Sequence, residues 1–257
     1  FVETCMECDN CTAGLENYCV KGFVPTYNGM SYDGEVMYGG YSSSIVVDDH
    51  YVLRIPDSLV LDVAAPLLCA GITTYSPLRE WEAGPGKRVG IMGLGGLGHM
   101  GVKHAVAMGA DVTLISHSPS KEADAKRLGA HDFLLLSDRD AMKERAMTFD
   151  LIVNTVSAPI KLDPVIRLLG TDGTMAYVGL PDKPLEMNIF GLNSQRRRVA
   201  GSNIGGIRET QEMLDFCAEH GYGSDVEVIE AAQINEAWER VVNSDVRYRF
   251  VIDATTF

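Results

Sequence analysis

The chain has 257 residues, of which 46% are hydrophobic, and its formal net charge is -13. This length accommodates one large domain or two smaller ones, and the apolar content is sufficient to bury a core. The acidity argues against nucleic acid or an anionic membrane as a partner, because phosphate groups demand Lys and Arg, and no apolar stretch approaches the length of a membrane-spanning helix.

The start of the chain is unusual for a complete protein. It opens Phe1-Val2-Glu3-Thr4 without an initiator methionine, and no positively charged and apolar leader precedes the first cysteine. We therefore expect that part of a larger protein is absent in front of this chain. The six cysteines, without a secretory context, predict a reducing, cytoplasmic location.

Four cysteines follow at once, with the spacing C-x2-C-x2-C-x7-C: Cys5, Cys8, Cys11 and Cys19. Four thiolates in so short a segment can surround one tetrahedral Zn²⁺ with no open position, which is typical of a structural site. Two disulfides are the rival interpretation, but such scaffolds are normally small secreted domains. Unligated buried thiols are a third interpretation, and the acidic residues within this segment disfavour it.

The segment up to about Asp62 predicts short strands and turns. Residues 42–47 and 51–56 are the clearest strand candidates, the second closed by a proline. Residues 64–71 then lead into a predicted helix over 72–78 that crosses between domains.

From Lys87 onward strands and helices alternate. Strands are expected at 88–92, 112–115, 133–136, 151–154 and 175–178, and helices at 97–108, 120–128 and 140–147. Such alternation indicates βαβ units and a parallel sheet. A helix over 210–220, a strand over 226–229, a helix over 234–243 and a strand over 249–253 complete the chain, while Arg196-Arg197-Arg198 is expected to be a solvated strand edge.

A glycine-rich turn joins the first of these strands to the first helix. Gly93-Leu94-Gly95-Gly96-Leu97-Gly98 fits G-x-G-x-x-G, and it lies in the strand–turn–helix context that a dinucleotide site requires. The glycines permit a tight turn and a close approach to a pyrophosphate, which the helix N-terminus attracts. The alternative is a glycine-rich turn that binds nothing.

The end of the next strand indicates which dinucleotide is bound. An enzyme that prefers NAD places a carboxylate about 20 residues after the first glycine, to bond the ribose 2′-hydroxyl. This chain instead offers Ser116, His117, Ser118 and Lys121, with no carboxylate before Glu122. We therefore predict NADP(H), and we expect Ser120 to cap the following helix.

Three motifs together resemble the zinc-containing medium-chain alcohol dehydrogenases: the four-cysteine lobe, Pro66–Thr73 and Gly93–Met100. Within them the chain is similar to the cinnamyl alcohol dehydrogenase branch, including its bacterial broad-range aldehyde reductases, and Glu209–Cys217 and Asp245–Asp253 strengthen the likeness. The resemblance spans the whole chain. It implies an α/β fold, with a Rossmann doubly wound parallel sheet and a mostly β, GroES-like catalytic domain that is incomplete in this chain. The expected divisions are a catalytic-domain remnant at 1–66, an NADP-binding domain at 67–207 and a returning segment at 208–257.

The resemblance also implies roles for single residues. Cys69 matches the third protein ligand of a catalytic zinc, and Thr73 matches a residue beside the nicotinamide, so these two are the catalytic candidates. The cofactor would further contact Thr155, Val178, Gly179, Ser202, Asn203 and Ile204. Asn203 stands where plant members carry a larger apolar residue that shapes the pocket for an aromatic alcohol.

The implied activity is hydride transfer between NADP(H) and a primary alcohol or its aldehyde, mainly as aldehyde reduction, by a homodimer joined edge to edge near Leu185–Phe190. The chain departs from the family in one respect. The first catalytic-zinc cysteine, a His-Glu pair and a proton-relay hydroxyl, which the family places before the zinc lobe, are missing from this sequence. Cys69 alone cannot hold a catalytic zinc, which needs about three protein ligands. Two alternatives are a truncated NADPH-binding module without catalysis and a zinc-independent quinone or enone reductase.

Overall fold

A computed structural model describes residues 1–257 as an α/β protein with two compact units. One unit combines Phe1–Ile72 with Ile204–Phe257, and the other is Thr73–Asn203. The sequence placed these divisions after Pro66 and Ile207. The positions differ because the first residues of helix α3 (Ala70–Glu80) stay with the first unit, where an added Cβ on Gly71 would lie 3.1 Å from the Met213 sulfur.

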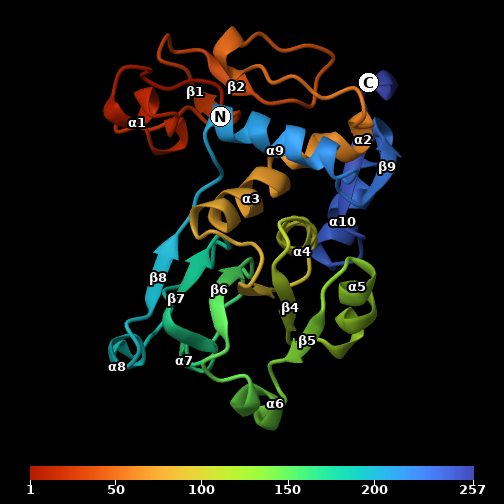
Figure 1. Cartoon of the computed structure of the whole chain (residues 1–257). Helices are drawn as coiled ribbons and strands as arrows, with labels where there is room; N and C mark the ends of the chain where they lie inside the picture. The colour runs from red at the N-terminus through yellow and green to blue at the C-terminus, as the bar shows by residue number, and fades with distance from the viewer. The chain divides into compact units, whose positions relative to one another are not determined.

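The unit Thr73–Asn203 contains one six-stranded parallel sheet in the order β5-β4-β3-β6-β7-β8 (Figure 1). This is the order of a doubly wound Rossmann sheet, and it confirms the predicted fold class. The order reverses between β3 and β6, and ligands of such sheets bind beyond the carboxyl ends of the strands at this point. The strands are β3 (Arg88–Met92), β4 (Asp111–Ser116), β5 (Asp132–Leu135), β6 (Phe149–Asn154), β7 (Leu169–Tyr177) and β8 (Arg198–Gly201).

Helices connect these strands at nearly the predicted positions. They are α3, α4 (Gly98–Ala107), α5 (Glu122–Arg127), α6 (Arg139–Glu144), α7 (Leu162–Ile166) and α8 (Ile189–Asn193), with a 3-10 turn at Pro119–Lys121. The helices α7 and α8 and strand β8 were not predicted, because four or five residues carry too little periodicity to be recognised.

The central strands are apolar and buried along almost their whole length. Val89 and Ile91 in β3 and Ile152 and Val153 in β6 have no solvent exposure. Strands of a parallel sheet are covered on both faces, so they read as continuous hydrophobic runs. One core cluster includes Phe149, Ile152, Leu169 and Met175.

The other unit has only small sheets. Strands β1 (Tyr27–Met30) and β2 (Val36–Tyr38) pair antiparallel, while β9 (Val226–Glu230) and β10 (Arg249–Asp253) pair parallel. Its helices are α1 (Asp9–Thr12), α2 (Leu61–Ala64), α9 (Ile207–Glu219) and α10 (Ile234–Val242), with 3-10 turns at Glu16–Tyr18, Asp49–Tyr51, Ala65–Leu68, Ala231–Gln233 and Ala254–Thr256. The predicted elements after residue 209 are thereby confirmed.

The predicted strands at 42–47 and 51–56 are wrong. A strand exists only where a neighbour completes its hydrogen-bond ladder, and neither segment pairs with another strand of this chain. The Gln211 side chain instead forms two hydrogen bonds with the backbone of Arg54. It accepts from the Arg54 N–H at 2.9 Å and donates to the Arg54 carbonyl at 3.0 Å.

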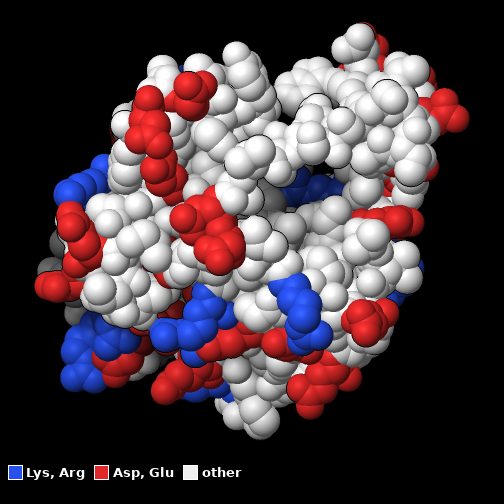
Figure 2. Space-filling model, turned by 90° about the horizontal axis from the view of Figure 1, so that it is seen from above, with Lys and Arg blue, Asp and Glu red and all other residues white.

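The surface carries charges of both signs among uncharged residues. On the face shown in Figure 2, Lys and Arg side chains alternate with Asp and Glu, and no continuous basic surface appears there. None of the helices combines the length and the apolar character needed to traverse a bilayer.

Candidate nucleotide and metal sites

The glycine-rich turn between β3 and α4 requires glycine at two positions. Gly93 has a φ of +91°, and an added Cβ would lie 2.9 Å from the Thr155 hydroxyl oxygen. A Cβ on Gly98 would lie 2.0 Å from the Gly93 carbonyl oxygen, which no real side chain tolerates. The turn therefore closes tightly on itself, as the motif predicts.

Gly95 has the opposite surroundings. A Cβ added to it would meet no protein atom within 4 Å, so its backbone faces open space. No side chain caps the N-terminus of α4, which begins three residues later at Gly98. Exposed backbone and uncapped helix N–H groups form the kind of surface that binds a pyrophosphate, so these residues fit a dinucleotide.

The turns after β6 and β7 lie against the glycine-rich turn. The Thr155 hydroxyl donates to the Met92 carbonyl at 2.8 Å, and the Val178 and Gly179 amides both donate to the Asn154 carbonyl at 3.0 Å. A Cβ on Gly179 would lie 2.3 Å from the Val156 carbonyl oxygen. The structure thus brings Gly93–Gly98, Thr155, Val178 and Gly179 together at the carboxyl ends of three neighbouring strands.

The end of β4 carries a cluster of hydroxyl groups. The buried Ser116 hydroxyl accepts from the Ser118 amide at 3.1 Å, and the Ser118 and Ser120 hydroxyls lie 2.9 Å apart. His117 is exposed and Lys121 is half-buried. The nearest helical carboxylate, Glu122, is paired with Lys126 at 2.6 Å. No acid therefore stands among the hydroxyls.

The predicted capping role of Ser120 is wrong. Lys121 occupies the N-cap position of α5, and no side chain caps that helix. The cause is the 3-10 turn Pro119–Lys121, which places Ser120 inside a helical turn instead of before it. Its hydroxyl is consequently left to bond Ser118.

The remaining cofactor candidates are spread over both units. Thr73 is buried in α3, and Ser202 and Asn203 follow β8, where the Ser202 amide donates to the Tyr177 carbonyl at 3.0 Å. Ile204 belongs to the other unit and adopts a φ of +45° before α9.

The four cysteines of the first segment converge. Their sulfur atoms all lie within 4.8 Å of one another, with Cys8 and Cys11 3.5 Å apart and Cys5 and Cys11 3.9 Å apart. A tetrahedral site with Zn–S bonds of about 2.3 Å separates sulfurs by about 3.8 Å, so the four thiols fit Zn²⁺. None of the six cysteines forms a disulfide, which removes the rival interpretation.

Hydrogen bonds and burial shift the pKa values of two of these thiols in opposite directions. The Val20 amide lowers the pKa of Cys8 to about 6, while burial raises the pKa of Cys11 to about 11. The Cys11 sulfur donates to the Thr4 hydroxyl at 3.5 Å, and that hydroxyl lies 2.9 Å from the Tyr51 hydroxyl. Hydroxyls that orient metal ligands form part of a metal site, and neither Thr4 nor Tyr51 was predicted from the sequence.

Cys69 stands apart from this cluster. Its side chain is exposed. The Cys5–Cys19 set is the only group of three or more His, Cys, Asp or Glu side chains close enough to share a metal ion. The residues of this chain therefore do not assemble a catalytic zinc site around Cys69.

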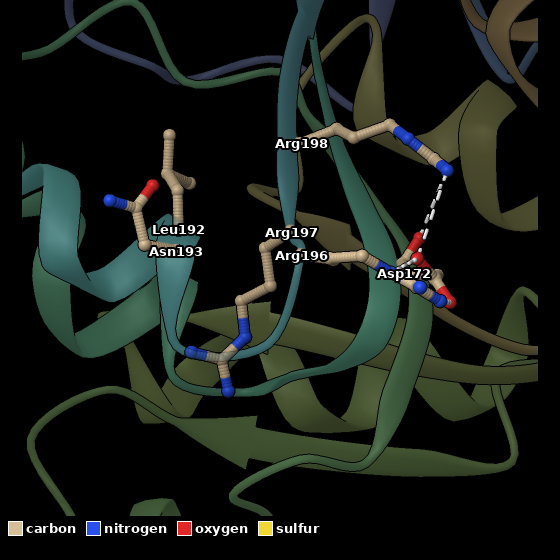
Figure 3. A pocket seen from close by; sticks show the side chains of 6 residues that line it. All are labelled: Asp172, Leu192, Asn193, Arg196, Arg197 and Arg198. Carbon is tan, nitrogen blue, oxygen red and sulfur yellow. Dashed lines mark hydrogen bonds and ion pairs between the residues drawn. The ribbon is translucent and has the colours of Figure 1, made fainter.

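A hollow of about 740 Å³ lies at the amino-terminal side of the sheet (Figure 3). Arg196 and Arg198 both form ion pairs with Asp172. The Arg197 side chain points in another direction and is buried. It donates to the Leu169 carbonyl at 2.8 Å and to the Gly191 carbonyl at 2.9 Å. The prediction of a solvated edge is wrong for Arg197, because its guanidinium is held in the interior by these two backbone carbonyls. The hollow lies near the amino-terminal ends of β7 and β8, whereas the glycine-rich turn follows the carboxyl end of β3, so the hollow is not part of the candidate nucleotide site.

Asn154 was also missed. It is fully buried at the end of β6 and makes hydrogen bonds to three backbone amides of the two turns that flank the glycine-rich turn. An amide residue directly after the apolar run Leu151–Val153 was the available signal, because polar residues at strand ends face the ligand edge of such sheets.

Residues 96–219 match the family described as zinc-binding dehydrogenase. The chain is 59% identical over 257 residues to NADP-dependent alcohol dehydrogenase C 1 of Mycolicibacterium smegmatis, and the match covers 100% of this chain and 74% of that protein. It is 54% identical over 260 residues to aldehyde reductase YahK of Escherichia coli, covering 99% and 74%. The chain thus spans about three quarters of the length of these relatives.

Solved structures give the same result. The cinnamyl alcohol dehydrogenase SbCAD4 of Sorghum bicolor superposes with a TM-score of 0.96 at 47% identity, over 99% of this chain and 73% of that one. The cinnamyl alcohol dehydrogenase of Helicobacter pylori, complexed with NADP(H), superposes with a TM-score of 0.90 at 38% identity, over 99% and 73%. The chain belongs to the zinc-containing medium-chain alcohol dehydrogenases and, within them, to the cinnamyl alcohol dehydrogenase branch.

Proposed function

We propose that this chain belongs to a zinc-dependent oxidoreductase that transfers a hydride between NADP(H) and a primary alcohol or its aldehyde, mainly towards the alcohol. Relatives named as an NADP-dependent alcohol dehydrogenase and as an aldehyde reductase, both above 50% identity, support the reaction class. The glycine-rich turn and the four-cysteine cluster supply surfaces that fit the dinucleotide and Zn²⁺. The substrate is a small molecule, and no nucleic acid or membrane takes part.

The observation that carries the cofactor assignment is the hydroxyl cluster at the end of β4. Ser116, Ser118 and Ser120 lie together without a carboxylate, and Lys121 follows them. Hydroxyls and a cation stabilise a 2′-phosphate, whereas the acid of NAD-preferring proteins would repel it. The glycine-rich turn would hold the pyrophosphate, and Thr73, Ser202, Asn203 and Ile204 would lie towards the nicotinamide.

Substitution of Lys121 tests this assignment. The Lys121→Ala variant should weaken NADPH binding by about ten- to a hundredfold, because one charge-assisted hydrogen bond to a phosphate contributes about 1.5–3 kcal/mol. NADH lacks that phosphate, so its dissociation constant should change less than about twofold. Lys126→Ala, which removes a lysine paired with Glu122 farther along α5, is the matched control. Equal losses for NADPH and NADH would contradict the assignment.

Metal content and turnover separate the proposal from its alternatives. We propose one zinc per chain, held by Cys5, Cys8, Cys11 and Cys19, because these are the residues that come together. A zinc bound at a catalytic site polarises a carbonyl oxygen as a Lewis acid, but Cys69 alone does not form such a site. Two zincs per chain, together with NADPH oxidation on addition of an aldehyde, would support the zinc-dependent reductase. Tight NADPH binding without turnover favours the binding module, and turnover of quinones alone favours the zinc-independent reductase.

We further propose a homodimer that forms along the open edge of the six-stranded sheet. Strand β8 is the outer strand, and the segment Leu185–Phe190 leads into α8 with Ile189 and Phe190 exposed by 57% and 74%. Exposed apolar side chains beside an unpaired strand favour association. Light scattering on the Phe190→Asp variant should show a smaller mass than the unsubstituted chain, and an unchanged mass would contradict this edge.

A further inference from the structure

Asn154 lies at the centre of the ligand edge of the sheet. It is the last residue of β6, and its partners in the register are Met92, the last residue of β3, and Tyr177, the last residue of β7. Its side chain has no solvent exposure. We propose that Asn154 is a positioning residue for the dinucleotide, whose side chain and carbonyl together fix the turns after β6 and β7. The inference rests on the proposed NADP(H) function.

Three backbone amides converge on this residue. The Asn154 carbonyl accepts from the amides of Val178 and Gly179, both at 3.0 Å. The Asn154 side-chain oxygen Oδ1 accepts from the Val156 amide at 2.9 Å. An Asn side chain that bonds the amide two residues ahead forms an Asx turn, which sets the backbone direction after the strand. Asn154 therefore fixes how the chain leaves both strands.

The position of Val156 transmits this effect to the glycine-rich turn. A Cβ on Gly179 would lie 2.3 Å from the Val156 carbonyl oxygen, and a Cβ on Gly93 would lie 2.9 Å from the Val156 Cγ2 atom. Val156 is thus wedged between two glycines of the candidate site. Because Val156 packs closely against both glycines, we expect a displacement of Val156 to shift at least one of them.

The amide group suits the site better than a carboxylate. The Asn154 nitrogen Nδ2 and the Tyr177 hydroxyl are both buried without a hydrogen bond of good geometry. Burial raises the pKa of Tyr177, and the nearby Asn154 amide acts in the opposite direction. A carboxylate at this position would place an unpaired negative charge in an apolar interior, beside a turn that is shaped for an anion.

A pair of substitutions isolates the Oδ1 contact. Asn154→Ala and Asn154→Ser leave cavities of similar size, but the serine hydroxyl can still accept from the Val156 amide as a weaker turn of the same kind. NADPH binding is measured by fluorescence titration of the whole chain. We expect Asn154→Ala to raise the dissociation constant about tenfold and Asn154→Ser to recover most of that loss. Thr174→Val removes a buried hydroxyl three residues before the end of β7 and serves as the control, with binding unchanged.

The titrations distinguish a failure of the proposed NADP(H) function from a failure of the positioning role of Asn154. If the unsubstituted chain does not bind NADPH, the proposed function fails, and this inference fails with it. If the unsubstituted chain binds NADPH and the two variants bind equally, the positioning role alone is overturned.

Hydrogen exchange of the unsubstituted chain provides a test that does not depend on the folding of any variant. The Val156 amide should exchange as slowly as those of Val178 and Gly179, and NADPH should protect all three further. A Val156 amide that exchanges as fast as an unbonded loop amide would overturn the proposal.

Discussion

The two compact units are stabilised in different ways. In Thr73–Asn203 the four inner strands each lie between two others, and Val89, Ile91, Ile152 and Val153 are completely buried. In residues 1–60 only a few apolar side chains are buried, namely Val2, Cys11, Cys19, Val24, Pro56 and Leu59. Two of these are members of the cysteine cluster. Where so little apolar surface is buried, a bound metal can supply the missing stabilisation.

Removal of zinc should have the largest effect on the difference between the two units. It should destabilise the segment that contains the cysteine cluster and leave the unit Thr73–Asn203 folded. Structural zinc sites contribute on the order of 10 kcal/mol to folding. We expect a chelator, or Cys11→Ser, to abolish hydrogen-exchange protection in residues 1–24, while peptides from β3 and β6 keep theirs. Exchange detected by mass spectrometry measures both regions in one sample. Cys217→Ser changes a buried cysteine outside the cluster and should leave the zinc content unchanged. Protection of residues 1–24 that survives zinc loss would refute the metal's structural role.

A core substitution should instead destabilise the unit Thr73–Asn203, because it removes buried apolar volume there. Phe149 is exposed by only 1% and belongs to the core cluster of that unit. Phe149→Ala should lower the free energy of unfolding by about 3–5 kcal/mol, from lost transfer free energy and the cavity that remains. Val46→Ala is the matched change in the first unit, where Val46 is 92% exposed, and it should cost less than about 0.5 kcal/mol. Denaturant titration measures both variants, and comparable costs would show that the contrast between the units is false.

The same contrast explains which elements could be predicted. Each strand of the six-stranded sheet is specified locally by a continuous apolar run, and the helix that follows it has its own periodicity. Residues 42–56 also have strand composition, but strand formation depends on a partner elsewhere in space, and composition cannot reveal whether that partner is present. The 3-10 turn that displaces Ser120 from the N-cap depends on Pro119 and on packing, which a capping pattern does not record.

Two glycines of the glycine-rich turn, Gly98 and Gly95, should respond differently to the same substitution. Gly98→Ala places a Cβ 2.0 Å from the Gly93 carbonyl oxygen, so the turn must distort. We expect a loss of about 2–3 kcal/mol in stability and a weakening of NADPH binding by about a hundredfold. Gly95→Ala meets no protein atom, so it should preserve the unfolding midpoint and weaken only the binding of NADPH. Titration of both variants with NADPH, alongside thermal unfolding, measures the difference. A stable Gly98→Ala variant with normal affinity would contradict the geometry of the turn.

The candidate site was predictable where the motif itself carries the chemistry. Glycine spacing, cysteine spacing and the missing carboxylate after β4 are all properties of contiguous sequence. The sequence did not predict roles for Asn154, Thr4 and Tyr51, because these roles depend on neighbours that folding brings close. Tyr51 is 47 residues from Thr4, and Tyr177 is distant from Asn154 in the chain. A single buried asparagine or threonine has no spacing pattern that distinguishes a positioning role from ordinary packing.

The smallest expected effect concerns Asp172, at the end of the sheet opposite the glycine-rich turn. Its hydrogen bond with Arg196 lowers the pKa of its carboxyl, and Arg198 adds to this effect. A carboxyl whose pKa is lower in the folded state stabilises the protein above the unfolded pKa of about 4, and the contribution is lost as the pH falls through the folded value. Asp172→Asn should therefore be slightly less stable than the unsubstituted chain at pH 7, and the difference should disappear in acid. High salt should shrink it as well, because the pair is exposed. Urea titrations at pH 7 and pH 3 measure it, with Asp140→Asn on α6 as the control. A difference that persists unchanged at pH 3 would show that the Asn substitution acts on the local backbone of β7, where Asp172 has a φ of +62°, and not through charge.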